Sequence, residues 1–205
     1  MNNKGILIII SGPSGAGKGT VVEELKKDTN YMLSISATTR APRKNETDGV
    51  HYFFKTAEEF EKMIDDKKLL EYASFCGNYY GTPVDYVNEK IENNKEVILE
   101  IEVQGALQVK KIYPDAVLIF LTPPSMGELR KRLEGRATET PEKIKMRLDR
   151  ATEEFGIIDK YDYIVINDSV ENAVENIKCI VKAEKMKAYR NLNLKSVLKG
   201  DILNA

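Results

Sequence analysis

Runs of hydrophobic residues alternate along the chain with stretches that have helical spacing. Residues 5–11 contain the continuous apolar run Ile6 to Ile10, and further strand-like runs occupy residues 97–103, 116–121 and 163–166. Strands that are buried on both faces of a parallel sheet have this continuous, β-branched pattern. The alternation of such strands with helices predicts βαβ units, and therefore an α/β fold with a parallel sheet flanked by helices.

Short polar motifs mark where predicted helices begin. Residues 20–27 follow the first strand and have helical spacing. Thr56 with Glu59, and Ser125 with Glu128, have the spacing of a capping box, in which side chains and backbone N–H groups pair reciprocally. These motifs predict helices that start just after Thr56 and Ser125.

Two threonine–proline pairs give a second kind of start signal. Thr82-Pro83 and Thr140-Pro141 each place a capping residue directly before a proline. Proline is favoured at the first helical position because its missing N–H is not needed there. We therefore predict that helices begin at Pro83 and Pro141.

Two stretches interrupt the regular alternation of strands and helices. Residues 36–90 combine short strands, turns and several aromatic residues, which predicts an insertion with a small sheet of its own. Residues 125–157 are rich in arginine, a pattern that is typical of a solvated helix face. The stretch from Asn191 onward is polar, and we expect it to be peripheral.

A glycine-rich segment after the first strand carries the strongest chemical signal. Its residues are Gly12, Pro13, Ser14, Gly15, Ala16, Gly17 and Lys18. A glycine-rich loop between a strand and a helix lets backbone N–H groups approach phosphate oxygens, and the helix directs its positive end at them. Lys18 adds a point charge at the β- and γ-phosphates. The segment predicts a P-loop that binds ATP; a glycine-rich turn without a ligand is the alternative.

The position after this lysine departs from the general P-loop motif. The motif has Ser or Thr there, and its hydroxyl ligates Mg²⁺. This chain has Gly19, and the hydroxyl of Thr20 is rotated by about 100° around the helix. We predict that a water molecule fills the missing ligand position, or that the metal depends more on nucleotide oxygens.

Composition excludes several classes of protein. The 205 residues include 31 Lys plus Arg and 32 Asp plus Glu, a net charge of −1, which argues against binding nucleic acid or anionic membranes through bulk charge. The longest apolar run is too short for a membrane span. Cys76 and Cys179 cannot form a four-cysteine zinc site, and we expect both as small, mostly buried side chains. The single histidine, His51, is predicted to be a turn or packing residue. With no signal-peptide pattern, we expect a cytoplasmic location.

Two clusters suggest a second ligand beside the ATP. Ser36, Arg40 and Arg43 lie close together before a turn, and guanidinium groups match phosphate oxygens in pairs. Glu100 and Glu102 alternate on one face at the carboxyl end of a predicted buried strand. Ligands of open α/β sheets bind at this end of the strands. The arginines therefore suggest an acceptor phosphate, although an exposed basic turn is an alternative, and the carboxylates suggest a Mg²⁺ environment.

The chain resembles the guanylate kinases over residues 5–185. Segments that occur in the family's order carry the resemblance: residues 12–18, 36–43, 48–54, 70–81, 100–105, 132–136 and 165–168. The resemblance implies three parts and a tail. These are an ATP-binding core (1–35, 91–124 and 158–190), an inserted α+β GMP-binding domain (36–90), a helical lid (125–157) and a C-terminal tail (191–205).

The resemblance also implies roles for single residues, each matched to a family motif. On the GMP side these are Ser36, Arg40, Arg43, Tyr52 and Tyr80 for the phosphate, Glu71 and Thr82 for guanine, and Glu100 as a further contact. In catalysis they are Lys18, Arg136 and Arg147 at the transferring phosphoryl group, assisted by Arg132, with Asn167 near adenine. Glu102 would lie near the water shell of Mg²⁺. The family commonly has aspartates where this chain has Glu100 and Glu102.

The implied activity is an ATP:GMP phosphotransferase of purine nucleotide metabolism that uses Mg²⁺ and accepts GMP and dGMP. Two alternatives stay open: a guanylate-kinase-like module that binds phosphorylated partners without catalysis, and another nucleoside monophosphate kinase. Lys18 and the lid arginines favour an enzyme, and Glu71 favours guanine. A carboxylate can accept from N1–H and the exocyclic amino group of guanine, whereas adenine presents an acceptor at N1. The oligomeric state stays open.

Overall fold

The computed structural model describes residues 4–75, 77–135 and 140–192 of the chain. Within these residues, five parallel strands form a central sheet in the order β2-β7-β1-β8-β9. The strands are β1 (Leu7–Ser11), β2 (Tyr31–Leu33), β7 (Glu96–Glu100), β8 (Val117–Thr122) and β9 (Tyr163–Ile166). The strand order reverses beside β1, and in open α/β sheets this reversal opens a crevice at the carboxyl ends of the strands.

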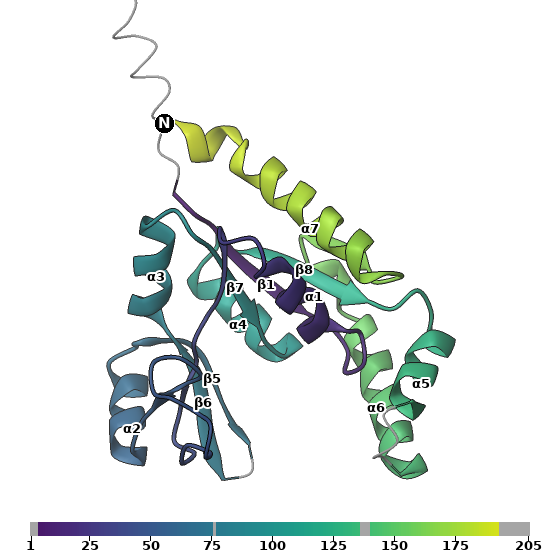
Figure 1. Cartoon of the computed structure of the whole chain (residues 1–205), viewed down its shortest axis with the longest axis horizontal. Coiled ribbons are helices and arrows are strands. Elements are labelled where there is room, and N and C mark those ends of the chain that lie inside the picture. The colour runs from purple at the N-terminus through teal and green to yellow at the C-terminus, as the bar shows by residue number, and fades with distance from the viewer. Residues whose placement is uncertain (1–3, 76, 136–139, 193–205) are drawn as a thin grey trace, which may run out of the picture.

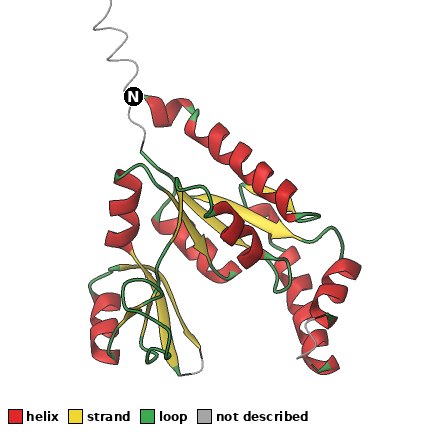
Figure 2. Cartoon of the chain, viewed as in Figure 1, coloured by secondary structure: helices red, strands yellow, loops and turns green. Residues whose placement is uncertain are grey.

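Helices cover both faces of this sheet, as the continuous hydrophobic run of β1 predicts (Figures 1 and 2). Ile8 and Ile10 pack in one core cluster with α1 (Lys18–Leu25) and α7 (Val170–Lys185). Leu7 and Ile9 belong to a second cluster with residues of α3 (Val84–Glu92) and α4 (Val103–Ile112). The predicted α/β fold with a parallel sheet flanked by helices is therefore confirmed.

A second sheet lies apart from the central one, at the lower left of Figure 1. Its order is β4-β3-β6-β5, from β3 (Ala37–Thr38), β4 (Phe53–Phe54), β5 (Leu69–Phe75) and β6 (Asn78–Pro83), with α2 (Ala57–Asp65) beside it. Phe60 of α2 is fully buried and stacks on Tyr79, their ring centroids 5.3 Å apart. The capping box of Thr56 and Glu59 forms in both directions. The predicted small sheet within residues 36–90 is confirmed.

The arginine-rich stretch forms a pair of helices, α5 (Met126–Glu134) and α6 (Pro141–Phe155), on the opposite side of the central sheet from the second sheet (Figure 1). They pack on each other through Leu129, Leu133, Leu148 and Ala151. Two short 3₁₀ helices, η1 (Ile158–Lys160) and η2 (Ala188–Asn191), follow later in the chain. Thr140 caps α6 and Pro141 occupies its first turn, as predicted.

Several predicted boundaries are wrong for identifiable reasons. The helix expected from Thr20 begins at Lys18, because Gly17 adopts a left-handed conformation and its carbonyl accepts from Val21 N. The helix expected from Pro83 begins at Val84, because β6 stays paired with β5 as far as Pro83. The strand expected over residues 97–103 ends at Glu100.

Some single-residue predictions also change. Ser125 caps α5 by accepting from Glu128 N, but in the described part of the chain the capping box stays one-sided, since the Glu128 carboxylate pairs with Arg132. Cys179 is exposed rather than buried, and Cys76 lies outside the described residues. His51 is a turn residue as predicted, with its Nδ1 accepting from Thr47 N at 3.0 Å.

Candidate active site

The glycine-rich loop joins β1 to α1 at the reversal point of the central sheet. Gly12, Gly15 and Gly17 have φ angles of 141°, 94° and 90°, a region that side chains disfavour. A Cβ atom at Gly12 would stand 2.1 Å from the carbonyl oxygen of Leu121, and one at Gly17 would stand 2.4 Å from Asn167 Nδ2. Glycine is therefore required here by backbone angle and by the close approach of neighbouring strands.

Lys18 lies over this loop at the start of α1. Its Nζ donates to the carbonyl oxygens of Gly12, at 2.5 Å, and Pro13, at 3.2 Å. The same side chain lines the large cavity described below. The lysine is thus the side chain that connects the glycine-rich loop with that cavity.

One predicted arginine of the α5–α6 pair contacts the loop directly, and a second contacts Asn167, which is itself bonded to the loop. Arg147 Nη1 donates to Ser14 Oγ in the loop. Arg132 Nη2 donates to the carbonyl of Asn167 at 2.9 Å, and Asn167 Nδ2 donates to the carbonyl of Ala16 at 2.8 Å. Arg136 lies outside the described residues. The prediction that residues 125–157 form only a solvated helix face is therefore wrong, because Arg132 and Arg147 bond to residues at the carboxyl edge of the central sheet.

A cavity of about 620 Å³ lies between the second sheet and the carboxyl edge of the central sheet. It brings together predicted residues from distant segments: Lys18, Ser36, Tyr52, Glu71, Tyr80, Glu100 and Glu102. A smaller adjoining cavity of about 220 Å³ shares Ser36, Tyr52 and Glu100 and adds Thr82. The volume of the large cavity suits a nucleotide-sized ligand. Its walls present both carboxylates and hydroxyl groups, which can form hydrogen bonds with such a ligand.

Glu71 and Thr82 form a hydrogen-bonded pair at the wall of this space. Thr82 is buried, and its hydroxyl donates to Glu71 Oε1 at 2.7 Å instead of capping a helix. Burial raises the pKa of Glu71, and the hydrogen bonds from Thr82 partly offset this rise. Glu71 Oε2 faces α4, where a Cβ atom at Gly105 would stand 3.4 Å away. A carboxylate held in this way can accept hydrogen bonds from a ligand.

Arg40 and Arg43 lie at the side of the cavity rather than among its lining residues. The Arg40 guanidinium donates to both carboxylate oxygens of Glu46, at 2.9 and 3.0 Å, and lies 5.4 Å from the centre of the Tyr52 ring. These hydrogen bonds to Glu46 raise the pKa of Arg40 and lower that of Glu46. Arg43 N donates to the same carboxylate at 2.8 Å. Glu46 thus holds both arginine positions of the turn together.

The two acidic residues of the strand end differ in position. Glu100 ends β7, and both its carboxylate oxygens would lie 3.8 Å from a Cβ atom at Gly19. Desolvation raises its pKa, while the charge of Lys18 lowers it. Glu102 lies beyond the strand, as the residue that precedes α4, so the predicted alternation on one strand face is wrong. Its carboxylate pairs with Arg150 of α6.

The donor set fits a magnesium ion only in part. Mg²⁺ takes oxygen ligands and is usually bound by one or two carboxylates, several waters and substrate phosphates. Glu100 and Glu102 supply such carboxylates beside the glycine-rich loop. Among the described residues no group of three or more His, Cys, Asp or Glu side chains forms a complete metal site. A magnesium ion here would depend on nucleotide and water oxygens.

Sequence reasoning missed several residues of the cavity. The sequence pattern places Arg150 on a solvated helix face, whereas this side chain lines the cavity. No sequence motif indicates Gln104 or Gln108, which line the cavity as well. Gln104 and Gln108 are four positions apart on α4, so they share one helix face that follows Glu102. Helical spacing after an acidic strand end is the signal that could have found them.

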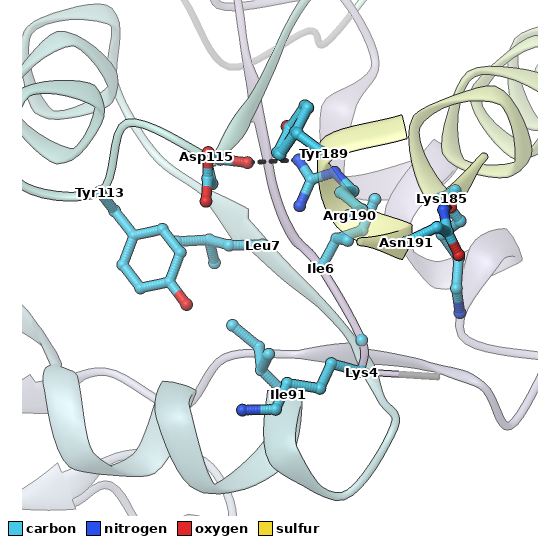
Figure 3. Close-up of a pocket in the computed structure, with 11 residues that line it drawn as sticks. Lys4, Ile6, Leu7, Ile91, Tyr113, Asp115, Lys185, Tyr189, Arg190 and Asn191 are labelled. Carbon is cyan, nitrogen blue, oxygen red and sulfur yellow. Dashed lines mark hydrogen bonds between the residues drawn. The ribbon is translucent and has the colours of Figure 1, made fainter. Parts of the chain in front are cut away.

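A further cavity, of about 250 Å³, lies at the opposite edge of the sheet, where β1 begins (Figure 3). Arg190 of η2 donates to the carbonyl oxygen of Asp115 at 2.7 Å beside it, and Tyr113 and Ile91 line its other side. It contains none of the predicted site residues. Ligands of open α/β sheets bind at the carboxyl ends of strands, so this cavity is at the wrong edge for the predicted chemistry.

Comparison with known proteins gives one consistent family. The guanylate kinase family model matches residues 4–184. A curated guanylate kinase of Halalkalibacterium halodurans is 58% identical over 188 residues, which cover 91% of this chain and 92% of that protein. The guanylate kinase of Bacillus subtilis strain 168 is 54% identical over 192 residues, covering 93% and 94%.

The fold comparison agrees with the sequence comparison. A crystal structure of guanylate kinase from Anaplasma phagocytophilum matches with a TM-score of 0.74 and 32% identity, covering 97% of this chain and 95% of that one. No helix in the described part of the chain is long and apolar enough to cross a membrane. Because family model, curated relatives and solved structure coincide over nearly the whole chain, the chain belongs to the guanylate kinase family, ATP:GMP phosphotransferases among the nucleoside monophosphate kinases.

Proposed function

We propose that the chain transfers the γ-phosphoryl group of MgATP to GMP, and also to dGMP, at the point where Lys18 joins the glycine-rich loop to the large cavity. That junction is the observation that carries the proposal. One lysine bonds to the loop carbonyls and also lines the cavity, so a donor phosphate and an acceptor phosphate would meet at the same charge.

On the donor side, the loop from Gly12 to Thr20 would hold the ATP phosphates. Successive N–H groups and the amino end of α1 attract phosphate oxygens, and nothing but glycine fits at the tightest positions. Lys18 would leave the carbonyls of Gly12 and Pro13 for the phosphates. Asn167, which is bonded to Ala16 of the loop, would lie near adenine.

On the acceptor side, the cavity would hold GMP. Ser36, Tyr52 and Tyr80 line it, and Arg40 lies over the Tyr52 ring with Arg43 nearby, so this group would hold the GMP phosphate. Glu71 and Thr82 would read guanine, with Glu100 as a further contact. An ionised Glu71 can accept from two adjacent donors of guanine, and adenine would leave it facing a lone pair. Sites built on such hydrogen bonds can discriminate by about 10⁴-fold.

Phosphoryl transfer itself needs positioning and charge neutralisation rather than a general base. We assign this work to Lys18, Arg136 and Arg147, assisted by Arg132. The bond of Arg147 to Ser14 supports this assignment because it brings one guanidinium group to the loop, and the bond of Arg132 to Asn167 supports it because Asn167 contacts the loop at Ala16. Water near the γ-phosphate would waste ATP, so a lid over the site suits the reaction.

Mg²⁺ would be held by nucleotide oxygens and water, with Glu102 in contact with its water shell and Glu100 close by. When bound, it would neutralise charge on the β- and γ-phosphates. The backbone of Gly19 lies beside the Glu100 carboxylate and brings no hydroxyl of its own there, which supports the prediction that a water molecule replaces the usual hydroxyl ligand. The substrates also support the expected cytoplasmic location, since ATP and GMP belong to the nucleotide pool there.

The proposed division of the chain follows from these roles. Residues 1–35, 91–124 and 158–190 would bind ATP, residues 36–90 would bind GMP, residues 125–157 would form the lid, and residues 191–205 a tail. The two separate sheets and the separate α5–α6 pair support this division.

The experiment that tests the proposal measures ADP release with MgATP and each of GMP, dGMP, AMP, CMP and UMP. We expect turnover with GMP and dGMP and none of comparable rate with the others. Turnover with AMP instead would identify another nucleoside monophosphate kinase. Binding of GMP by folded protein without turnover would instead support the non-catalytic binding module.

A further inference from the structure

A chain of three charged side chains joins the α5–α6 pair to the edge of the central sheet. Arg150 of α6 donates from Nη2 to Glu102 Oε2, at the residue that precedes α4. The same guanidinium donates from Nε to Glu154 Oε1, one helical turn away, at 3.1 Å. Arg150 and Glu102 both line the large cavity, and Lys18 is on the same wall. Residues 48 positions apart in sequence are thereby held together.

The three linked side chains differ in burial: Arg150 and Glu102 are exposed, whereas Glu154 is buried. The side chains of Arg150 and Glu102 are 60% and 69% exposed, and exposed ion pairs contribute only about 0–1 kcal/mol to stability. Glu154 is only 8% exposed, and its Oε2 has no hydrogen-bond partner in the described part of the chain. A buried carboxylate costs stability unless it is paired. Stability alone therefore does not account for the arrangement.

The geometry of the two hydrogen bonds made by Arg150 suits a role in positioning the Glu102 carboxylate. A guanidinium group presents its donors in a rigid planar fork, so a bond at Nε fixes the direction in which Nη2 points. Glu154 is anchored in the packed helix, and Arg150 transmits that position to Glu102. Arg150 engages the Glu102 carboxylate through Oε2, and Glu102 is one of the residues that line the large cavity.

We propose that Arg150 is a positioning residue for the phosphoryl transfer: anchored by buried Glu154, it holds the Glu102 carboxylate in the orientation that accepts hydrogen bonds from Mg²⁺-bound water. This inference rests on the proposed function, in which Glu102 contacts the metal's water shell. It adds a residue of α6 to the metal environment. It also means that the metal environment is complete only when α6 lies against the edge of the sheet.

The test compares Arg150→Ala, Arg150→Lys, Glu102→Gln and the double variant Arg150→Ala/Glu102→Gln. Arg130→Ala is the matched control, because Arg130 is an exposed arginine of α5. Two quantities are measured for each: kcat with GMP at varied Mg²⁺, and the Mg²⁺-dependent gain in ADP affinity by titration calorimetry. The second readout needs no turnover.

Loss of an outer-shell partner typically costs about 10–100-fold in metal affinity or activity. We expect Arg150→Ala and Glu102→Gln each to reduce kcat and the Mg²⁺-dependent gain by about 10-fold. The double variant should lose no more than the worse single variant, because both changes break one interaction. Arg150→Lys should fall between, since lysine keeps the charge and loses the fork. Glu154→Gln should show a smaller loss in the same direction, since its amide oxygen still accepts from Nε.

Three outcomes would overturn the inference while leaving the proposed function intact. Wild-type rates and Mg²⁺ dependence in Arg150→Ala would show an ordinary surface ion pair. Losses that multiply in the double variant would show that the two residues act independently. A rise in KM for GMP without change in kcat would mark Arg150 as a direct substrate contact. Failure of the proposed function itself would appear in the wild type and in Arg130→Ala.

Discussion

The two halves of the candidate site are built by different means. The glycine-rich loop is one continuous segment whose working groups belong to the backbone, apart from Lys18. The large cavity is lined by side chains from the second sheet, the end of β7, α4 and α6. A backbone site depends on φ angles and close approach, whereas a side-chain site depends on which charges the fold brings together. Substitutions should therefore damage the two halves in different ways.

Their electrostatics differ as well. The loop collects positive charge, from the amino end of α1, from Lys18 and from Arg147. The cavity collects carboxylates, and desolvation raises the pKa of both Glu71 and Glu100. An excess of partly buried carboxylates is unfavourable in the free protein. It is the expected arrangement for a site that accepts hydrogen bonds from guanine and that approaches a metal ion.

The largest effect should come from Arg147→Ala, which removes a positive charge that contacts the glycine-rich loop at Ser14. We expect kcat to fall by about 10³-fold or more, as for other arginines that stabilise a transferring phosphoryl group. Thermal stability should change little, because Arg147 is only half-buried and its hydrogen bond to Ser14 is exposed. Steady-state kinetics with GMP checks this, with Arg130→Ala as the control. A change in KM alone would make Arg147 a ground-state binder.

Glu71→Gln should damage the cavity half alone. The amide can accept one guanine hydrogen bond, but its NH₂ group would face the second guanine donor. We expect kcat/KM for GMP to fall by about 10²-fold or more, while ADP affinity of the loop stays as in the wild type. Equal losses for both nucleotides would contradict the assigned role. Thr82→Val is a milder companion, since it removes the hydroxyl that bonds to Glu71.

Gly17→Ala should damage the loop half alone. Alanine at φ 90° is strained, and its Cβ would stand 2.4 Å from Asn167 Nδ2. Strained backbone conformations of this kind cost about 1–3 kcal/mol each, and we expect weaker ADP binding in addition. Gly77→Ala is the matched control, because Gly77 also has a positive φ, 76°, while its added Cβ would meet no atom of the described residues within 4 Å apart from its chain neighbours. Equal loss of ADP affinity in both variants would contradict the clash.

Gly19→Ser should change the Mg²⁺ requirement by a smaller factor. Gly19 lies where the glycine-rich loop meets the cavity residue Glu100. A Cβ atom at this position meets only the Glu100 oxygens at an ordinary 3.8 Å, so the serine should fit. We expect its hydroxyl to lower the Mg²⁺ concentration needed for half-maximal turnover by a few-fold. The measurement is a Mg²⁺ titration of turnover, with Gly127→Ser on α5 as the control. An unchanged Mg²⁺ requirement would remove support for a water ligand in the wild type.

The smallest effect concerns stability of the free protein. Because burial raises the folded pKa of Glu71, the folded state binds its proton more tightly than the unfolded state does. The stabilisation from this proton is present at acid pH and is lost as pH rises through the raised pKa. Glu71→Gln should therefore be more stable than wild type at neutral pH, by about 1 kcal/mol. The difference should vanish near pH 4, below which the unfolded carboxyl is also protonated. Thermal unfolding at both pH values checks this, and greater stability of the wild type at neutral pH would contradict it.

Prediction from sequence succeeded where the determining interactions are local. The run Ile6 to Ile10 predicted a strand buried on both faces, and the glycines predicted a loop between that strand and a helix, because both patterns can be recognised in a short segment of sequence. Prediction failed where a contact comes from far along the chain. Thr82 has the local signal of a helix cap, yet β6 stays paired with β5 and its hydroxyl bonds to Glu71. Arg150 had the pattern of a solvated helix face, yet it bonds to Glu102.

The sequence by itself determined the strand–loop–helix unit to which we assign phosphate binding, the alternation that gives a parallel sheet, and the residue types available for the proposed contacts with guanine and phosphate. Periodicity, glycine conformation and capping are local properties, so they are readable along one chain. Only the tertiary structure decided which carboxylate meets which partner: Glu71 with Thr82, Arg40 with Glu46, and Glu102 with Arg150 and the buried Glu154. Such pairs depend on how the second sheet and the α5–α6 pair pack against the core, and packing is a property of the whole chain.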